Sequence, residues 1–201
     1  EELQIRYEYV NLDMQAQAHK QPEFLAINPM GRVPAIVDGD FQLWESGAIL
    51  LYLAEKYGNI SSDLDSRATI TQWVLFGNST LSSAILVKEN MAREAPELLS
   101  AVDQILSRQP FLLGDHFSVA DVAVGSILAY IPIMLKMDVS AYPEVVNETK
   151  QLMSKLDLNS YPAVLNYITQ LSQRPAFQKS IGSRYKVWTS ALTHTNRHWY
   201  A

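Results

Sequence analysis

Glu45 and Ser46 begin a predicted helix and carry the side chains best suited to hold a charged head group. The first turn of a helix offers unpaired N–H groups and the positive end of the helix dipole, which together attract a carboxylate. The Ser46 hydroxyl can add a hydrogen bond, and the Glu45 carboxylate can accept an ammonium group. The pair could therefore bind the head group of an amino acid. The same two residues also fit a plain helix N-cap with a solvated acid beside it.

Two other segments carry hydrogen-bonding groups that could face the same ligand. Val33 stands just before Pro34 at a predicted strand edge, where its N–H and C=O could pair with an extended peptide beside Arg32. His19 and Lys20 are adjacent and could face a second carboxylate. Each segment also has a simpler interpretation, the first as a loop-to-strand junction and the second as a solvated loop.

The elements that must position these residues can be predicted from periodicity and turn residues. Alternation over 5–12 predicts a strand with Ile5, Tyr7 and Tyr9 on one face, and Asp-Gly predicts a tight hairpin turn. The predicted order is the end of a helix at 1–4, a strand at 5–12, a short helix at 21–26, a turn at 28–31, a strand at 33–37, a hairpin turn at 38–40, a strand at 41–44 and a helix at 46–57 that ends at Gly58.

After a polar segment at 59–66, which reads as a linker, the pattern is helical throughout. Helices are predicted over 67–92, 96–108 and 119–137, the last being apolar nearly all round and therefore the buried centre of its domain. Ser118 and Asp121 form a predicted capping box at its start. The segments 138–147 and 157–166 resemble each other, each opening a helix through Tyr-Pro, so we expect a local insertion or duplication around 138–160.

Composition limits the function further. Hydrophobic residues make up 48% of the 201 residues, enough for a sizeable core. The net charge of −5 argues against nucleic acid or an anionic membrane as a partner, and no apolar run approaches the roughly 18 residues that span a bilayer. The chain has no Cys, so it has no thiolate metal site or cysteine nucleophile, and its four His lack metal-ligand spacing. We predict no metal.

The motifs in combination resemble the glutathione transferase superfamily, with theta-, phi- and nu-like members most similar. In order they are His-Lys, Pro-x-Phe, Asn-Pro-x-Gly-x-Val-Pro, Asp-Gly, Glu-Ser-x-Ala-Ile and Tyr-Leu, with the densest match over 28–57. In the second half, 117–121 (Phe-Ser-Val-Ala-Asp) is similar to the family's capping motif and 174–177 (Arg-Pro-Ala-Phe) to its final-helix motif. The resemblance covers nearly the whole chain.

The resemblance implies an α/β plus all-α fold: a partial thioredoxin-like glutathione-binding domain at 1–58, a linker at 59–66 and a helical bundle at 67–201. It assigns glutathione contacts to His19, Lys20, Arg32, Val33, Pro34, Glu45 and Ser46. His19 and Lys20 would contact the glycyl end, Val33 would pair with the cysteinyl part before a cis proline, and Glu45 and Ser46 would bind the γ-glutamyl group.

The implied activity is conjugation of glutathione, as co-substrate, to a small electrophile by a cytoplasmic homodimer. The electrophile would lie between the two domains. Candidate pocket residues are Trp73, Phe76, Asn78 and Tyr130, with Trp73 and Phe76 fitting core packing better. The C-terminal residues Trp188, His194, His198 and Trp199 could cover the pocket or lie on the surface. A glutathione-dependent disulfide reductase and a non-catalytic assembly module are the alternatives.

The chain departs from the family pattern in two places that matter for activity. The match begins at the end of the family's first helix, so the first strand and the catalytic Ser, Tyr or Cys loop have no counterpart. We therefore assign no catalytic residue, and we expect a truncated chain rather than an enzyme that works without the strand. Arg32 stands where many relatives carry Gln, which should keep the backbone contact and alter the side-chain contact.

Overall fold

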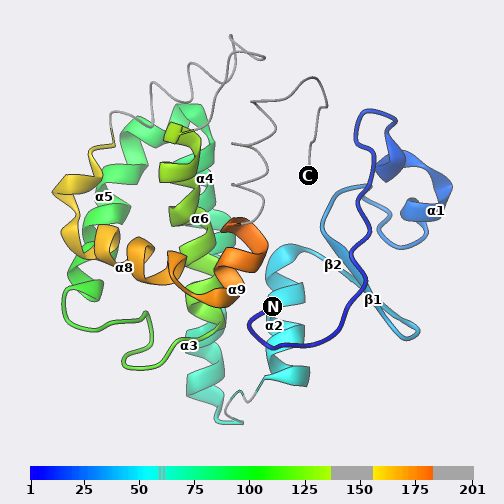
Figure 1. The fold of residues 1–201 in the computed structure, drawn as a ribbon, viewed down its shortest axis with the longest axis horizontal. Coiled ribbons are helices and arrows are strands. Elements are labelled where there is room, and N and C mark those ends of the chain that lie inside the picture. Colours follow the sequence, from blue (N-terminus) through cyan, green and yellow to red (C-terminus); the bar gives the residue numbers. More distant parts are fainter. Residues whose placement is uncertain (59, 61, 137–155, 183–201) are drawn as a thin grey trace. The chain divides into compact units, whose positions relative to one another are not determined.

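The computed structural model describes residues 1–58, 60, 62–136 and 156–182 (Figure 1). Two compact units are present, one formed by the described residues of 2–60 and the other by Glu1 together with the described residues from 62 onward. We call them the N-terminal unit and the helical unit. The predicted domain limits at 58 and 67 stay predictions.

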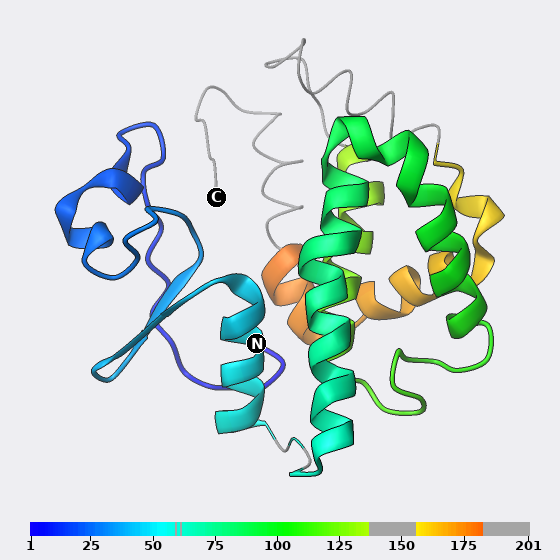
Figure 2. The same ribbon diagram turned by 180° about the vertical axis from the view of Figure 1, so that it is seen from behind.

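The N-terminal unit is built around a two-stranded antiparallel hairpin and one long helix. Its elements are the 3₁₀-helix η1 (Ala18–Lys20), α1 (Pro22–Leu25), β1 (Ala35–Asp38), β2 (Phe41–Trp44) and α2 (Ser46–Tyr57) (Figures 1 and 2). The register runs from Ala35 opposite Trp44 to Asp38 opposite Phe41, so Gly39 and the next residue form a two-residue loop. Gly39 has φ of 64°, a conformation that glycine adopts at no steric cost. The predicted hairpin is therefore confirmed.

The strand predicted over 5–12 is wrong. These residues have no regular secondary structure, and Tyr7 and Tyr9 are more than half exposed. Alternation favours a strand only where a neighbouring strand completes the hydrogen-bonded ladder, and among the described residues β1 and β2 pair only with each other. The helix end predicted at 1–4 is also wrong, because a turn occupies Glu2 and Leu3.

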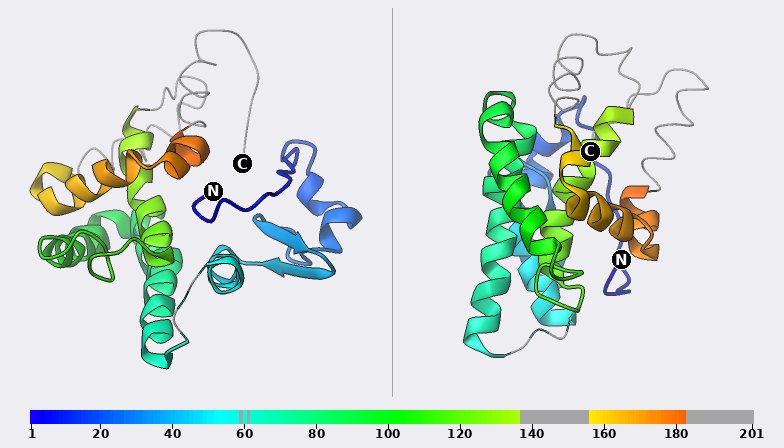
Figure 3. Two further views of the ribbon diagram at one scale, coloured as in Figure 1. Left: turned by 60° about the horizontal axis from the view of Figure 1, so that its bottom comes forward. Right: turned by 90° about the vertical axis from the view of Figure 1, so that its left-hand side faces the viewer.

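The helical unit is a bundle in which α6 is the central helix. Its elements are α3 (Leu64–Leu75), the π-helix η2 (Phe76–Leu81), α4 (Ser82–Leu86), α5 (Lys88–Leu106), α6 (Val119–Lys136), the 3₁₀-helix η3 (Leu158–Ser160), α8 (Pro162–Ser172), α9 (Pro175–Phe177) and the π-helix η4 (Gln178–Gly182). α6 packs against α3, η2, α4 and α8, whereas α5 packs against α4 and α8 (Figure 3). The predicted central role of the 119–137 helix is confirmed over its described part.

Three helix boundaries differ from the prediction. α3 begins at Leu64, inside the range predicted as a linker, because the Asp63 carboxylate caps it by accepting the Ser66 N–H at 2.9 Å. The predicted helix over 67–92 is interrupted at Val87, which is extended. The next helix starts at Lys88 rather than at Pro96, which lies inside it. Helix breaking by Pro96 is outweighed by packing, since α5 buries a full apolar stripe in the core.

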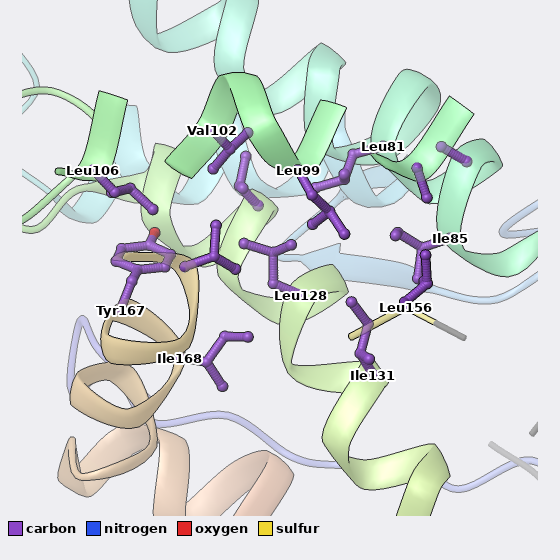
Figure 4. Close-up of a cluster of buried hydrophobic side chains, with 14 of the residues drawn as sticks. Leu81, Ile85, Leu99, Val102, Leu106, Leu128, Ile131, Leu156, Tyr167 and Ile168 are labelled. Carbon is purple, nitrogen blue, oxygen red and sulfur yellow. The ribbon is translucent and has the colours of Figure 1, made fainter. Parts of the chain in front are cut away.

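The core of the helical unit forms where α4, α5, α6 and α8 meet. Figure 4 shows side chains converging from these helices, and the cluster includes Ile85, Leu99, Val102, Leu128, Ile131 and Ile168. One buried carboxylate lies among them. Asp121 accepts the Ser118 N–H at 2.8 Å, the Leu112 N–H at 2.9 Å and the Tyr167 hydroxyl at 2.8 Å. The predicted capping box is thus confirmed, and it also ties α6 to α8.

The insertion predicted around 138–160 lies mostly outside the described residues. Its last part forms η3, and α8 then begins with Pro162 at the first helical position, as the Tyr-Pro signal predicts. In the described ranges, none of the helices combines the length and apolarity needed to cross a membrane.

Candidate functional site

The hairpin register brings two of the predicted binding segments to the same end of the N-terminal unit. Ala35 opens β1 and is paired with Trp44, which closes β2. Val33 and Pro34 enter β1 at the end where Glu45 and Ser46 leave β2. Segments separated by ten residues in sequence are therefore neighbours, because the strands between them are antiparallel and equally long.

Val33 presents its backbone at this end. The Val33–Pro34 peptide bond is cis, as the resemblance predicts, and the Val33 residue is 42% exposed. Pro34 has no N–H, so the ladder of β1 starts only at Ala35. Within the described chain, no backbone hydrogen bond engages the Val33 N–H or C=O. An extended ligand of peptide character could pair with these two groups.

Glu45 and Ser46 form the entry to α2, with roles that differ from the prediction. Ser46 is the first helical residue rather than the N-cap, and Glu45 occupies the cap position. The Glu45 side chain makes no capping hydrogen bond, although its C=O accepts the Ile49 N–H at 2.9 Å. The first-turn N–H groups are therefore not capped by the residue that normally does so. This is the physical requirement for a carboxylate-binding helix end.

Glu45 also carries an unusual backbone conformation. Its φ is 72° and its ψ is 118°, whereas residues with a Cβ normally avoid positive φ. Such conformations cost about 1–3 kcal/mol and persist where the surrounding structure holds them, most often at functional sites. The sharp change of direction between β2 and α2 depends on this residue.

The Lys20 side chain is held in place by two backbone carbonyl groups and is not a free cation. Its ammonium donates to the C=O of Gly31 at 2.8 Å and to the C=O of Met30 at 3.3 Å. These bonds hold η1 against the turn that leads into Val33. An ammonium has three donors, so one proton remains for a ligand. His19, the other predicted contact, has a buried Nδ1 atom with no hydrogen-bond partner among the described residues.

Asn28 is a site-supporting residue that sequence reasoning did not single out. It is buried, its side-chain NH₂ donates to the C=O of Arg32 at 2.6 Å, and its side-chain oxygen accepts the Met30 N–H at 3.0 Å. Gly31 completes the turn with φ of 58°, and a Cβ there would lie 2.9 Å from the His19 carbonyl oxygen. The Arg32 side chain is exposed, while its carbonyl is fixed by Asn28. An Asn that precedes Pro-x-Gly is a turn signal that could have identified this role.

The predicted electrophile-pocket residues belong to the helical unit. Trp73 and Phe76 pack against its core with their rings edge to face at 5.5 Å, which favours the core-packing interpretation. Tyr130 is 45% exposed. The four C-terminal candidates at 188–199 lie outside the described residues. Across the described ranges, no group of three or more His, Asp or Glu side chains is placed to hold a metal ion.

Comparison with known families gives the same assignment for both units. Residues 1–55 match the glutathione S-transferase N-terminal domain, and residues 87–170 match the glutathione S-transferase C-terminal domain. These matches confirm the predicted fold class, α/β followed by all-α.

Individual relatives agree. The chain is 32% identical to glutathione S-transferase F10 of Arabidopsis thaliana over 59% of its own length, and this match spans 66% of the plant protein. It is 30% identical to the disulfide-bond oxidoreductase YfcG of Escherichia coli over 73% of its length and 79% of that protein. The structure of glutathione transferase URE2P6 from Phanerochaete chrysosporium, in complex with oxidized glutathione, superimposes with a TM-score of 0.70 at 28% identity, covering 92% of this chain and 88% of the other. The chain therefore belongs to the glutathione S-transferase superfamily.

Proposed function

We propose that the chain binds glutathione at the end of the hairpin where Val33 and the α2 N-terminus are neighbours, and that it transfers the tripeptide to an electrophile. One observation carries this proposal. An exposed peptide edge at Val33 and a helix N-terminus at which Glu45 provides no side-chain cap lie at the same end of the hairpin. Glutathione has a peptide backbone and a terminal amino-acid head group, so it complements both features.

The proposed contacts are those that the family resemblance implies. Val33 pairs through its backbone with the cysteinyl part, and the first turn of α2 with Ser46 binds the γ-glutamyl carboxylate. Glu45 accepts the γ-glutamyl ammonium. His19 and the remaining proton of Lys20 face the glycyl carboxylate. Arg32 keeps its carbonyl fixed by Asn28, and its exposed side chain adds a contact that differs from the Gln of many relatives.

The chemistry is supplied by the ligand, because the chain has no cysteine. The glutathione sulfur would form a bond to the electrophilic carbon, the leaving group would depart with its bonding electrons, and the thiol proton would pass to solvent. No catalytic residue is assigned among the described residues. A homodimer, a cytoplasmic location and a small electrophile as second substrate complete the proposal, supported by the family resemblance alone.

Isothermal titration of glutathione into the chain and its Ser46→Ala variant tests the binding site. Loss of one hydrogen bond to a charged ligand group should weaken binding about tenfold or more. Ser107→Ala is a matched control, because Ser107 is an exposed serine at the end of α5, and it should bind like the parent chain. A parent chain that does not bind glutathione, or a Ser46→Ala variant with unchanged affinity, would reject the site.

Reduction of disulfides is the second candidate, favoured by the similarity to YfcG over most of both chains. Two glutathione molecules would reduce one disulfide to two thiols and become one molecule of oxidized glutathione. Parallel assays with 1-chloro-2,4-dinitrobenzene and bis(2-hydroxyethyl) disulfide separate the two reactions. Binding without either activity would instead favour an assembly module.

A further inference from the structure

A polar cluster joins the tip of the hairpin to the C-terminal half of α2. One oxygen of the Asp38 carboxylate accepts the Tyr57 hydroxyl at 2.7 Å, the Lys56 ammonium at 2.8 Å and the Tyr52 hydroxyl at 3.0 Å. The Lys56 ammonium also donates to the Tyr52 oxygen at 3.0 Å and lies over the Tyr52 and Tyr57 rings at 5.4 and 5.1 Å. We call these four residues the Asp38 clamp. None of them was predicted to contact a ligand.

The clamp lies at the opposite end of α2 from the proposed glutathione contacts. Asp38 closes β1 and is paired with Phe41, whose ring lies 5.0 Å from the Tyr52 ring. The hairpin tip is thus fastened to the second half of α2, and the other end of the hairpin is joined covalently to its first residue. α2 is therefore held at two points.

Apolar packing alone gives α2 little restraint within its unit. Of its residues only Ile49 and Ala54 are buried, and Glu45 supplies a backbone bend that is unfavourable for a residue with a Cβ. Without a second attachment, this bend could relax and α2 would tilt. Tilting would redirect the first-turn N–H groups, whose hydrogen bonds depend steeply on angle.

The electrostatics of the clamp keep it charged at neutral pH. Hydrogen bonds from Lys56 and Tyr57 lower the pKa of the Asp38 carboxyl below its usual range. The hydrogen bond to Asp38 is the largest cause that raises the pKa of Lys56 and the pKa of Tyr57. The ion pair and the neutral Tyr57 hydroxyl are consequently present together under the conditions in which glutathione would bind.

We propose that the Asp38 clamp positions the glutathione site by fixing the direction of α2, so that Asp38, Tyr52, Lys56 and Tyr57 act as positioning residues for the γ-glutamyl end of the ligand. The inference rests on the proposed function, because it concerns the same site. It goes beyond that function because it proposes that residues without ligand contact influence the affinity for glutathione.

A positioning role of the Asp38 clamp must be distinguished from a role in folding alone. A shortened ligand allows this distinction. Cysteinylglycine lacks the γ-glutamyl group and keeps only the part assigned to Val33, His19 and Lys20. A clamp that acts through α2 should therefore matter for glutathione and not for cysteinylglycine. A clamp that only supports the fold should affect both ligands alike.

The experiment compares dissociation constants of both ligands by NMR titration, which covers the millimolar range. The variants are Asp38→Ala and Tyr57→Phe, with Asp40→Ala as the matched control from the same exposed turn. We expect both clamp variants to bind glutathione about fivefold more weakly or worse, since small misplacements of binding groups are costly. Their affinity for cysteinylglycine and all affinities of Asp40→Ala should stay at the parent values.

The outcomes separate this inference from the function on which it rests. Parent-like glutathione binding by both clamp variants, or equal weakening of both ligands, would overturn the positioning role and leave the proposed site intact. Failure of the parent chain to bind glutathione would reject the proposed function and this inference with it. If Asp38→Ala does not fold by circular dichroism, Tyr57→Phe decides, because it removes one exposed hydroxyl and retains the ring.

Discussion

At the scale of single residues, the proposed binding role of the Glu45 side chain conflicts with the backbone conformation of Glu45. Its carboxylate is the group proposed to accept the γ-glutamyl ammonium, while its backbone has the φ of 72° that would suit glycine. Glycine at this position would be easier to fold and would lack the binding group. Under the proposed function, the residue type at 45 favours the ligand over the stability of the free chain, in the manner expected of strained functional sites.

This conflict can be measured with a pair of substitutions. Glu45→Gly and Glu45→Ala both remove the carboxylate, so both should bind glutathione more weakly than the parent. Only glycine relieves the positive φ, and Glu45→Gly should exceed Glu45→Ala in free energy of unfolding by about 1 kcal/mol in urea titrations. Asp40, which has no positive φ, supplies the control pair, in which glycine should bring no such gain. Equal stabilities of the two Glu45 variants would contradict strain at this residue.

At the scale of elements, the helical unit depends on close approach between helices. The π-helix η2 places Gly77 against α6, and a Cβ on Gly77 would lie 3.0 Å from the Ala123 carbonyl carbon and 3.2 Å from the Val124 nitrogen. Both are backbone atoms of a buried helix and cannot move aside like a side-chain end. A residue without Cβ is thus required for the packing of η2 on α6.

Gly77→Ala should accordingly destabilise the chain despite the better helix propensity of alanine. Overpacking against a fixed neighbour typically costs about 1–3 kcal/mol, which we expect as a loss of unfolding free energy in urea or heat. Ser79→Ala tests the same π-helix at an exposed position and should change stability by less than about 0.5 kcal/mol. If Gly77→Ala were neutral, α6 would have room to shift, and the tight contact would not determine the packing.

The elements also show what could be predicted from sequence and what could not. Turn chemistry and proline signals located the hairpin, the start of α1 and the start of α8, since these depend on local backbone preferences. The strand over 5–12 failed because a strand requires a neighbour that local alternation cannot guarantee. The boundary at Val87 and the inclusion of Pro96 in α5 were missed because tertiary packing decides them.

The candidate site likewise contains features that the sequence could predict and features that it could not. Val33, Pro34, Glu45 and Ser46 were predicted as contacts from their motifs and the family resemblance, and the hairpin register explains why the two segments are neighbours. The partners of Lys20 and the support by Asn28 depend on contacts between separate turns, which no periodicity records. The Asp38 clamp likewise joins residues 14 to 19 positions apart and becomes visible only in three dimensions.

At the scale of the whole molecule, the two units differ in how much apolar surface they bury internally. The helical unit contains the continuous core of α4, α5, α6 and α8, whereas the buried apolar side chains of the N-terminal unit are Ile49 and Ala54 among its described residues. Segments with few buried contacts open at lower free energy than a core. The proposed ligand site thus lies in the less stable unit, where binding can add the most order.

Hydrogen exchange followed by mass spectrometry tests this difference directly. Amides of α5 and α6 should exchange slowest, and those of β1, β2 and α2 at least about tenfold faster, because local opening exposes them without global unfolding. Glutathione should slow exchange in α2 and in the 28–37 segment and leave α6 unchanged, since a ligand protects the unit that it stabilises. Equal protection of α2 and α6 in the free chain would show that the small core does not make the N-terminal unit less stable than the helical unit. Protection by glutathione confined to the helical unit would move the binding site away from Val33 and Ser46.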